Sequence, residues 1–265
     1  MKKVISLVLA ILMMATVALS FISCGESQES DLSYVQKKGT LVVGITDYQP
    51  MDYQDSNGKW IGFDAELATA FAKSLGVDVE FSVIADWDEK AMELSSKNID
   101  CVWNGMTLDD EVKAAMDCSV PYCTNTQVVI IAADKADQYQ TLEACGKLKF
   151  AVEKGSAGMK TAKANGWSYT EVGDQATALM EVAAGTSDAA IIDLLMAGAM
   201  VGEGTSYSNL TYTIAVSEEE QFGVGFRKGS DLVAKLNEFL AQSLKSGEME
   251  RIAKIYGTQE AIIKN

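Results

Sequence analysis

Two aspartates stand directly after buried-strand patterns and could bind a charged group. Asp47 follows the apolar run 41–45, and Asp193 closes the run 189–192. Open α/β sheets place ligand sites at the carboxyl ends of their strands, beside the helices that follow. Each residue also has a structural interpretation, because Asp47 could shape the turn after its strand and Asp193 could cap a helix over 194–201.

A turn of small residues, Gly155-Ser156-Ala157-Gly158, leads from another strand pattern into a helix. Backbone amides at a helix N-terminus favour anions, so Ser156 and Ala157 are candidates for an anion contact. The composition alone is a weak signal, since many strand-to-helix loops share it. Trp87 has two interpretations, stacking on a ligand or packing in the core beside a helix cap at Asp88.

Several classes of chemistry are disfavoured by what the sequence lacks. It contains no histidine, the usual general base and a common zinc ligand. The spacing of Cys101, Cys118, Cys123 and Cys145 matches no zinc motif, and we expect free, buried thiols at these positions. No catalytic triad, Walker loop or metal cluster is present. We therefore predict no metal site and no cofactor, although Asp and Glu side chains remain available as acids or bases.

Alternating strand and helix patterns must position these residues, and this order predicts an α/β fold. The clearest helix follows Gly62, with Phe63, Leu67, Phe71 and Leu75 on one face at four-residue spacing and Asp64 as its expected cap. Other expected strands are 77–81, 99–103, 127–132, 150–152, 169–172, 189–192 and 212–216. Other expected helices are 32–38, 88–96, one from 156, 174–184, 232–244 and 249–256.

The length and charge restrict the possible partners. A chain of 265 residues can form one large domain or two lobes with separate cores. The formal net charge of −15 argues against nucleic acid and favours cationic or zwitterionic ligands over anionic ones.

The first residues have the pattern of a secretory signal. Lys2 and Lys3 precede the apolar run 4–18, which is shorter than the roughly 20 residues of a membrane-spanning helix. The sequence around Cys24 resembles a bacterial lipoprotein signal, which would make Cys24 the lipidated first residue of the mature protein. An ordinary secretion signal with a chance cysteine is the alternative.

The segment 99–122 carries the most specific resemblance to a known family. Its matching motifs are Ile99-Asp100, Asn104-Gly105-Met106-Thr107, Glu111 and Asp117-Cys118-Ser119-x-Pro121-Tyr122, in addition to Gly62-Phe63-Asp64. With them the chain resembles the type II periplasmic solute-binding proteins of family 3, the polar amino-acid receptors of ABC transporters, in lipoprotein form.

The resemblance implies a two-lobed fold in which each lobe is a mixed sheet flanked by helices. Two hinge crossings, near Asn125-Thr126 and Glu220-Gln221, would join the lobes. Residues 1–23 would be the signal peptide and 24–38 a lipid-anchored tether with a short helix. Lobe 1 would comprise 39–124 with 223–265, and lobe 2 would comprise 125–222 with the hinge segments.

The resemblance also implies roles for individual residues. The Gly105 carbonyl, the Thr107 hydroxyl and Asp193 would receive the ligand's α-ammonium group. Asp47 would contact its side chain, and Trp87 would stack on it. In the family an arginine five residues after the threonine holds the carboxylate, but this sequence has Val112 there.

Three substitutes for the missing arginine are open. Backbone amides near Asp109 and Ser156 could hold the carboxylate. Lys113 or Lys154 could act as a point charge. The ligand could also lack an α-carboxylate.

The leading interpretation is therefore not an enzyme but a lipid-anchored, monomeric binding protein on the extracytoplasmic face of the membrane. It would capture a small polar amino acid or a related amine by lobe closure and deliver it to an ABC transporter permease. The alternative is a dehydratase or lyase on the same fold, with Asp47, Glu153 or Asp193 as acid or base.

Overall fold

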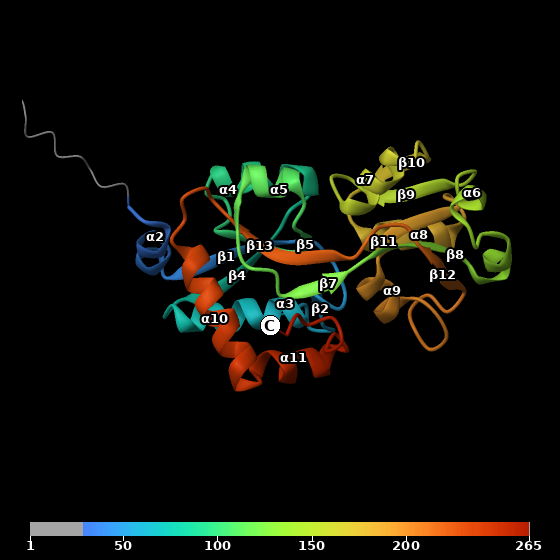
Figure 1. Cartoon of the computed structure of the whole chain (residues 1–265). Coiled ribbons are helices and arrows are strands. Elements are labelled where there is room, and N and C mark those ends of the chain that lie inside the picture. The colour runs from blue at the N-terminus through green and yellow to red at the C-terminus, as the bar shows by residue number, and fades with distance from the viewer. Residues whose placement is uncertain (1–28, 265) are drawn as a thin grey trace, which may run out of the picture. The chain divides into compact units, whose positions relative to one another are not determined.

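The computed structural model describes residues 29–264 and contains two main sheets, each with its own helices (Figure 1). In the first lobe the strand order is β4-β1-β5-β13-β6, and β7 also pairs with β13. The strands are β1 (Thr40–Ile45), β4 (Asp78–Val83), β5 (Cys101–Thr107), β6 (Asp117–Cys118), β7 (Cys123–Asn125) and β13 (Glu220–Phe226). Strand β1 runs parallel to β4 and β5, whereas β13 is antiparallel to β5, so the sheet is mixed.

Helices cover both faces of this sheet because the strands are apolar on both sides. Along β5, Cys101 and Trp103 face one hydrophobic cluster while Val102 and Met106 face another, as the period of two requires. The first cluster is covered by α3 (Phe63–Ser74), α10 (Leu232–Ser246) and α11 (Glu248–Tyr256), and the second by α4 (Lys90–Ser95) and α5 (Asp110–Ala115) (Figure 1). The remaining elements of this lobe are α2 (Asp31–Lys38), the short helix η2 (Trp87–Glu89), and the hairpin strands β2 (Tyr53–Gln54) and β3 (Trp60–Ile61).

Helix α3 confirms the predicted four-residue spacing, since Phe63, Leu67 and Phe71 are fully buried on one face. The expected cap at Asp64 is wrong. The N-cap residue is Gly62, and the Asp64 carboxylate turns into the core, where it accepts hydrogen bonds from the Gly105 amide at 2.7 Å and the Tyr122 hydroxyl. The Asp64 side chain therefore connects the start of α3 to strand β5.

The second lobe has the strand order β10-β9-β11-β8-β12. Its strands are β8 (Gln127–Ala132), β9 (Lys149–Glu153), β10 (Ser168–Val172), β11 (Ala189–Asp193) and β12 (Leu210–Ala215). Its helices are η3 (Ala133–Gln138), α6 (Leu142–Cys145), α7 (Ala157–Ala164), α8 (Gln175–Ala184) and α9 (Leu194–Met200). Strand β9 is parallel to β10 and β11, whereas β8 is antiparallel to β11 and β12.

The chain crosses between the two sheets twice. It leaves the first sheet with β7 and enters the second with β8 one residue later, and it returns between β12 and β13. The side chains of Thr126 and Ser217, one in each crossing, lie 3.2 Å apart at their hydroxyl oxygens. Two adjacent, extended connections of this kind are suited to act as a hinge.

Three of the four cysteines agree with the expectation of free, buried thiols, and the expected burial of Cys118 is wrong. In the described part of the chain, Cys101, Cys123 and Cys145 are free and buried, and Cys118 is free and partly exposed. Cys24 and the predicted signal peptide lie outside the described residues. Within 29–264 no helix has both the length and the apolar character needed to cross a membrane.

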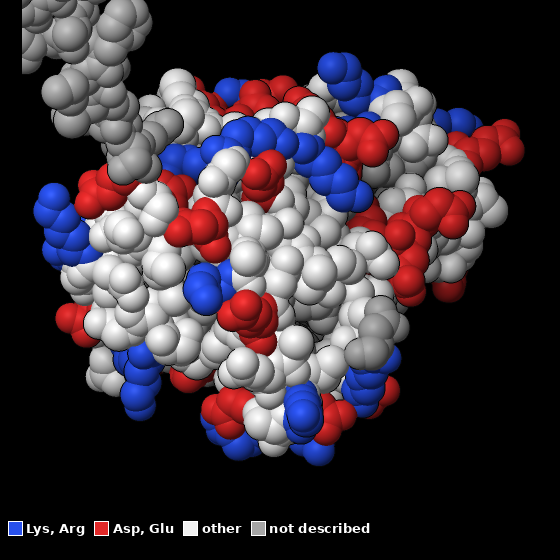
Figure 2. Space-filling model, turned by 60° about the vertical axis from the view of Figure 1, so that its left-hand side comes forward, with Lys and Arg blue, Asp and Glu red and all other residues white. Residues whose placement is uncertain are grey.

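The surface carries charges of both signs. Figure 2 shows acidic and basic side chains side by side over the visible face, with the basic ones most frequent along its upper edge. Uncharged surface lies between these charged groups. Acidic residues outnumber basic ones by 37 to 22 in the sequence, so the long-range field of the molecule is negative.

Candidate functional site

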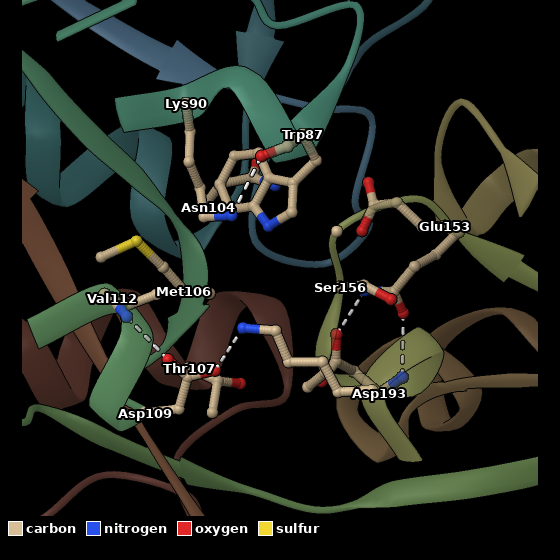
Figure 3. A pocket seen from close by; sticks show the side chains of 15 residues that line it. Trp87, Lys90, Asn104, Met106, Thr107, Asp109, Val112, Glu153, Ser156 and Asp193 are labelled. Carbon is tan, nitrogen blue, oxygen red and sulfur yellow. Dashed lines mark hydrogen bonds and ion pairs between the residues drawn. The ribbon is translucent and has the colours of Figure 1, made fainter. Parts of the chain in front are cut away.

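A pocket opens between the two lobes, at the carboxyl ends of strands from both sheets (Figure 3). Its volume is about 30 Å³, which holds about two water molecules. Lobe 1 contributes Trp87, Lys90, Asn104, Gly105, Met106, Thr107, Asp109 and Val112. Lobe 2 contributes Glu153, Gly155, Ser156, Ala157, Lys160, Gln175 and Asp193.

Asp193 ends strand β11 and is 4 % exposed. It occupies the N-cap position of α9, but its side chain makes no capping hydrogen bond there. Its carboxylate accepts from the side-chain amides of Asn125, Gln127 and Gln175, at 2.8 Å in the case of Gln127. Burial, and to a smaller extent the charge of Glu220, raise the pKa of Asp193 to about 7. The carboxylate is thus fixed by neutral donors, and no described cation forms an ion pair with it.

Glu153, at the end of the neighbouring strand β9, is a second buried acid in the same wall of the pocket. Its Oε1 atom has no hydrogen-bond partner among the described residues. Burial and the charge of Asp193 raise its pKa to about 8. The lobe 2 wall therefore presents two carboxyl groups that a cationic group in the pocket would stabilise in their ionised forms.

The lobe 1 wall is built on the end of β5. Gly105 has a φ of +55°, and a Cβ at this position would lie 2.6 Å from the Tyr48 ring, so the close approach requires glycine. The Thr107 hydroxyl donates to Glu220 at 3.1 Å. Asn104 is held by two hydrogen bonds to Thr46, at 2.7 and 3.0 Å, and so stiffens this wall.

The predicted anion contact lies at the start of α7. Ser156 is the N-cap residue, and its hydroxyl accepts from the Met159 amide at 3.1 Å. Trp87, the first residue of η2, is mostly buried and contacts the pocket from lobe 1. The expected cap at Asp88 is wrong, because Asp86 is the N-cap and accepts from the Asp88 amide.

Val112, where the resemblance implies an arginine, is buried in the pocket wall. Neither lysine proposed as a substitute lies in this wall. Lys113 is exposed on α5, and Lys154 forms an ion pair with Asp86. The basic residues that do line the pocket are Lys90 and Lys160.

Ion pairs connect the two lobes around the pocket. Lys160 from lobe 2 contacts Asp109 at 2.6 Å and Glu111 at 2.7 Å in lobe 1, and Lys154 from lobe 2 contacts Asp86 in lobe 1. These side chains are partly exposed, so each pair contributes little on its own. They join the two lobes at the rim of the pocket.

The structure brings together six of the seven residues that the sequence predicted for the ligand: Trp87, Gly105, Thr107, Ser156, Ala157 and Asp193. Asp47 is exposed and lies outside this lining. Partial desolvation by the surrounding chain raises the pKa of Asp47, and the charge of Asp174 in lobe 2 acts in the same direction. A contact of Asp47 with a ligand stays a prediction.

Lys90, Lys160 and Gln175 line the pocket without having been predicted. Lys90 and Lys160 stand in helix patterns where a lysine is usually solvated. Gln175 follows the N-cap residue of α8, and only the fold shows that its amide reaches Asp193. Glu153, which the sequence suggested only as a possible acid or base of an enzyme, also lines the pocket, and its place at the end of a strand is a usable signal.

The pocket acids predict a pH dependence of stability. Asp193 and Glu153 have folded-state pKa values of about 7 and about 8, above the roughly 4 expected in the unfolded chain. A raised pKa contributes stability that is complete below the unfolded value and is lost as pH rises through the folded value. The free energy of unfolding in urea is therefore expected to fall by at least about 1 kcal/mol between pH 5 and pH 8. Glu153→Gln should reduce this fall, and a flat profile in the wild type would contradict the assignment.

Comparison with known proteins places this geometry in context. A family model described as bacterial extracellular solute-binding proteins, family 3, matches residues 41–259. The L-cystine-binding protein TcyJ of Escherichia coli strain K12 is 29% identical over 232 residues, or 86% of each chain. A solved structure of the ancestral amino acid-binding protein AncCDT-1, a precursor of cyclohexadienyl dehydratase, has a TM-score of 0.78 and 32% identity, covering 86% of this chain and 99% of that one.

An ABC uptake transporter substrate binding protein from Streptococcus pneumoniae with bound histidine has a TM-score of 0.79 and 26% identity, covering 90% of this chain and all of the other. These similarities confirm the predicted fold class, two mixed-sheet lobes joined by two crossings.

Proposed function

Because the chain belongs to family 3 of the bacterial extracellular solute-binding proteins, we propose that it is the extracytoplasmic receptor of an ABC importer and binds a small polar amino acid. The observation that carries this proposal is the Asp193 carboxylate, buried in an interlobe pocket and held by three neutral amides. A buried carboxylate without a counter-charge favours a ligand that supplies an ammonium group. The related proteins named above for L-cystine and histidine support an amino acid.

Closure of the lobes would complete the site. The lining comes from both lobes, so the ligand would enter while the lobes are apart. The two crossings would act as the hinge, and the Lys160 and Lys154 ion pairs would form on closure. The ammonium group would then lie between Asp193, the Gly105 carbonyl and the Thr107 hydroxyl. Backbone amides near Thr107 and Ser156 would face the carboxylate.

Ligand identification combined with recovery of that ligand tests the proposal. Mass spectrometry of ligand retained through purification and a thermal-shift screen of amino acids and amines should identify a compound that raises the melting temperature. That compound should be recovered chemically unchanged after long incubation. A screen in which no amino acid or amine raises the melting temperature would contradict the proposal.

An enzyme is the second candidate, and Glu153 is the observation that favours it. A buried carboxyl group with a pKa of about 8 is protonated near neutral pH and could act as a general acid in a dehydratase or lyase. The solved ancestral relative is itself an amino acid-binding protein and a precursor of a dehydratase. A product that accumulates in proportion to protein concentration, and that disappears in Glu153→Gln, would establish this candidate over simple binding.

We also propose a lipid anchor at Cys24, which lies outside the described residues. The support is the apolar run 4–18 and the small residue Ser23 before the cysteine. In a bacterial host the protein is expected to sediment with membranes, and Cys24→Ala should release it or leave it mislocalised. Mass spectrometry that finds an unmodified cysteine or another N-terminus in a fully soluble wild type would rule the anchor out.

A further inference from the structure

The pocket contains a buried ammonium group that the proposed function has not used. Lys90 is the first residue of α4, is 7 % exposed and lines the pocket from lobe 1. Its side chain extends beside Trp87, with the Nζ atom 3.0 Å from the Trp87 carbonyl oxygen and 5.1 Å from the ring centroid (Figure 3). Among the described residues it forms no ion pair.

The other basic groups near the site are already paired. Lys160 contacts two carboxylates, and Lys154 contacts Asp86. The two arginines of the chain lie outside the pocket lining, where Arg227 pairs with Asp31 and Asp100 and Arg251 pairs with Glu248. Of the two lysines that line the pocket, Lys160 is paired with carboxylates, and Lys90 forms no ion pair among the described residues.

A buried ammonium without a counter-ion is costly, and an anion that enters the pocket would offset this cost. Burial is the largest influence on the pKa of Lys90 and lowers it; the charge of Lys160 acts in the same direction, while those of Asp88, Glu153 and Asp109 oppose it. None of these acids forms an ion pair with Lys90, so the charge interaction is only partly balanced. A bound anion would favour the ionised lysine.

The position of Lys90 also suits a zwitterion. Lys90 and Val112 lie on the lobe 1 wall, and Trp87 packs with Val112 in one apolar cluster. The opposite wall, from lobe 2, carries Glu153 and Asp193. Lys160 and Asp109, which also line the pocket, pair with each other. The lining charges without an ion pair therefore differ in sign between the lobes, with Lys90 on lobe 1 and Glu153 and Asp193 on lobe 2. Val112, where the family resemblance implies an arginine, lies on the same wall as Lys90.

We propose that Lys90 binds the carboxylate of the ligand, which makes the site selective for α-amino acids over the corresponding amines. This assignment rests on the proposed function and deepens it. The Lys90 ammonium supplies the positive charge, while the amides near Thr107 and Ser156 supply directed hydrogen bonds. The ligand's ammonium lies across the pocket, on Asp193.

Matched pairs of probes that differ only in the carboxylate test this assignment by calorimetry. The pairs are L-histidine with histamine, L-cystine with cystamine, and L-arginine with agmatine. The wild type should bind at least one amino acid, and at least tenfold more tightly than its decarboxylated partner. Lys90→Met should weaken that amino acid by about 30-fold or more and leave the amine unchanged or tighter. Lys113→Met, the exposed-lysine control, should behave as the wild type does.

Each other outcome overturns a defined part of the argument. If no amino acid in the three pairs or in the wider thermal-shift screen binds the wild type, the proposed function fails and the Lys90 assignment fails with it. If the wild type binds an amino acid but Lys90→Met binds it equally well, the Lys90 assignment alone is wrong. Equal losses for the amino acid and the amine would make Lys90 a structural partner, for example of Glu153 on closure.

The assignment stays testable if Lys90→Met does not fold. Lys90→Arg keeps the charge and should keep the preference for the amino acid. Measurements on the wild type alone can also contradict the assignment. If it binds each amino acid and the corresponding amine with equal affinity, Lys90 does not contact the carboxylate.

Discussion

Asp193→Ala is expected to abolish amino-acid binding. The substitution removes the counter-charge of a buried ammonium group, and truncation of one partner of such a pair costs about 2–5 kcal/mol. At 25 °C this is a loss of roughly 30-fold to several thousand-fold in affinity, measured by calorimetry with the amino acid found in the screen. Asp134→Ala, which removes an exposed carboxylate of the same lobe, should bind normally.

The stability of Asp193→Ala separates a lost contact from a lost fold. Because burial raises the pKa of Asp193 to about 7, its ionised form is unfavourable in the ligand-free protein at pH 8. Removal of this charge offsets part of the cost of leaving the Asn125, Gln127 and Gln175 amides without their acceptor. The variant should therefore still show a cooperative melting transition at pH 8. If Asp193→Ala folds and still binds with wild-type affinity, the ammonium site is elsewhere.

Gly155→Ala is expected to prevent full closure and to weaken binding by at least about tenfold. Gly155 has a φ of +72°, and a Cβ there would lie 2.7 Å from the Asp88 amide nitrogen and Cα atom, in the opposite lobe. Backbone atoms at that distance cannot move aside as a flexible side chain can, so the lobes would have to separate. Displaced binding groups lose much of their interaction energy, because the site depends on their geometry.

Gly166→Ala is the matched control for this prediction. Gly166 lies in the same lobe with a similar φ of +67°, but no atom lies within 4 Å of the position of its Cβ. Both variants should lose about 1 kcal/mol of stability through backbone strain, whereas only Gly155→Ala should lose affinity. Equal affinities in the two variants would show that the contact between Gly155 and Asp88 does not govern closure.

Sequence periodicity predicted the parts of the fold that depend on local burial. The four-residue spacing in α3 and the apolar runs of β8 and β11 are read directly from residue types, and the choice of Asp193 follows from its place at the end of β11. The role of Asp64 could not be found in this way. An aspartate in the first turn of a helix usually caps it, and only the neighbouring strand β5 supplies the Gly105 amide that draws the carboxylate inward.

The composition of the pocket depends on contacts between segments far apart in the sequence. Gln175 bonds Asp193 across 18 residues, and Lys160 meets Asp109 across 51. No periodicity encodes such distances, since the first contact arises when α8 packs on β11 within lobe 2 and the second when the two lobes meet. The burial of Lys90 could not be predicted either. A lysine at the start of a helix has the sequence pattern of a solvated residue, and only the three-dimensional structure shows that it lines the pocket.

The buried hydrogen bond from Gly105 to Asp64 has a consequence for engineering this receptor. Asp64 is fully buried and fixes the backbone on which Gly105 and Thr107 stand, so it shapes the pocket without facing its contents. Three residues that line the pocket belong to other elements and include a basic, an apolar and an acidic side chain: Lys90, Val112 and Glu153. A library that randomises those three positions and leaves residues 62–64 and 105–107 intact should therefore yield folded proteins with altered ligand preference, and would make this chain a scaffold for new biosensors.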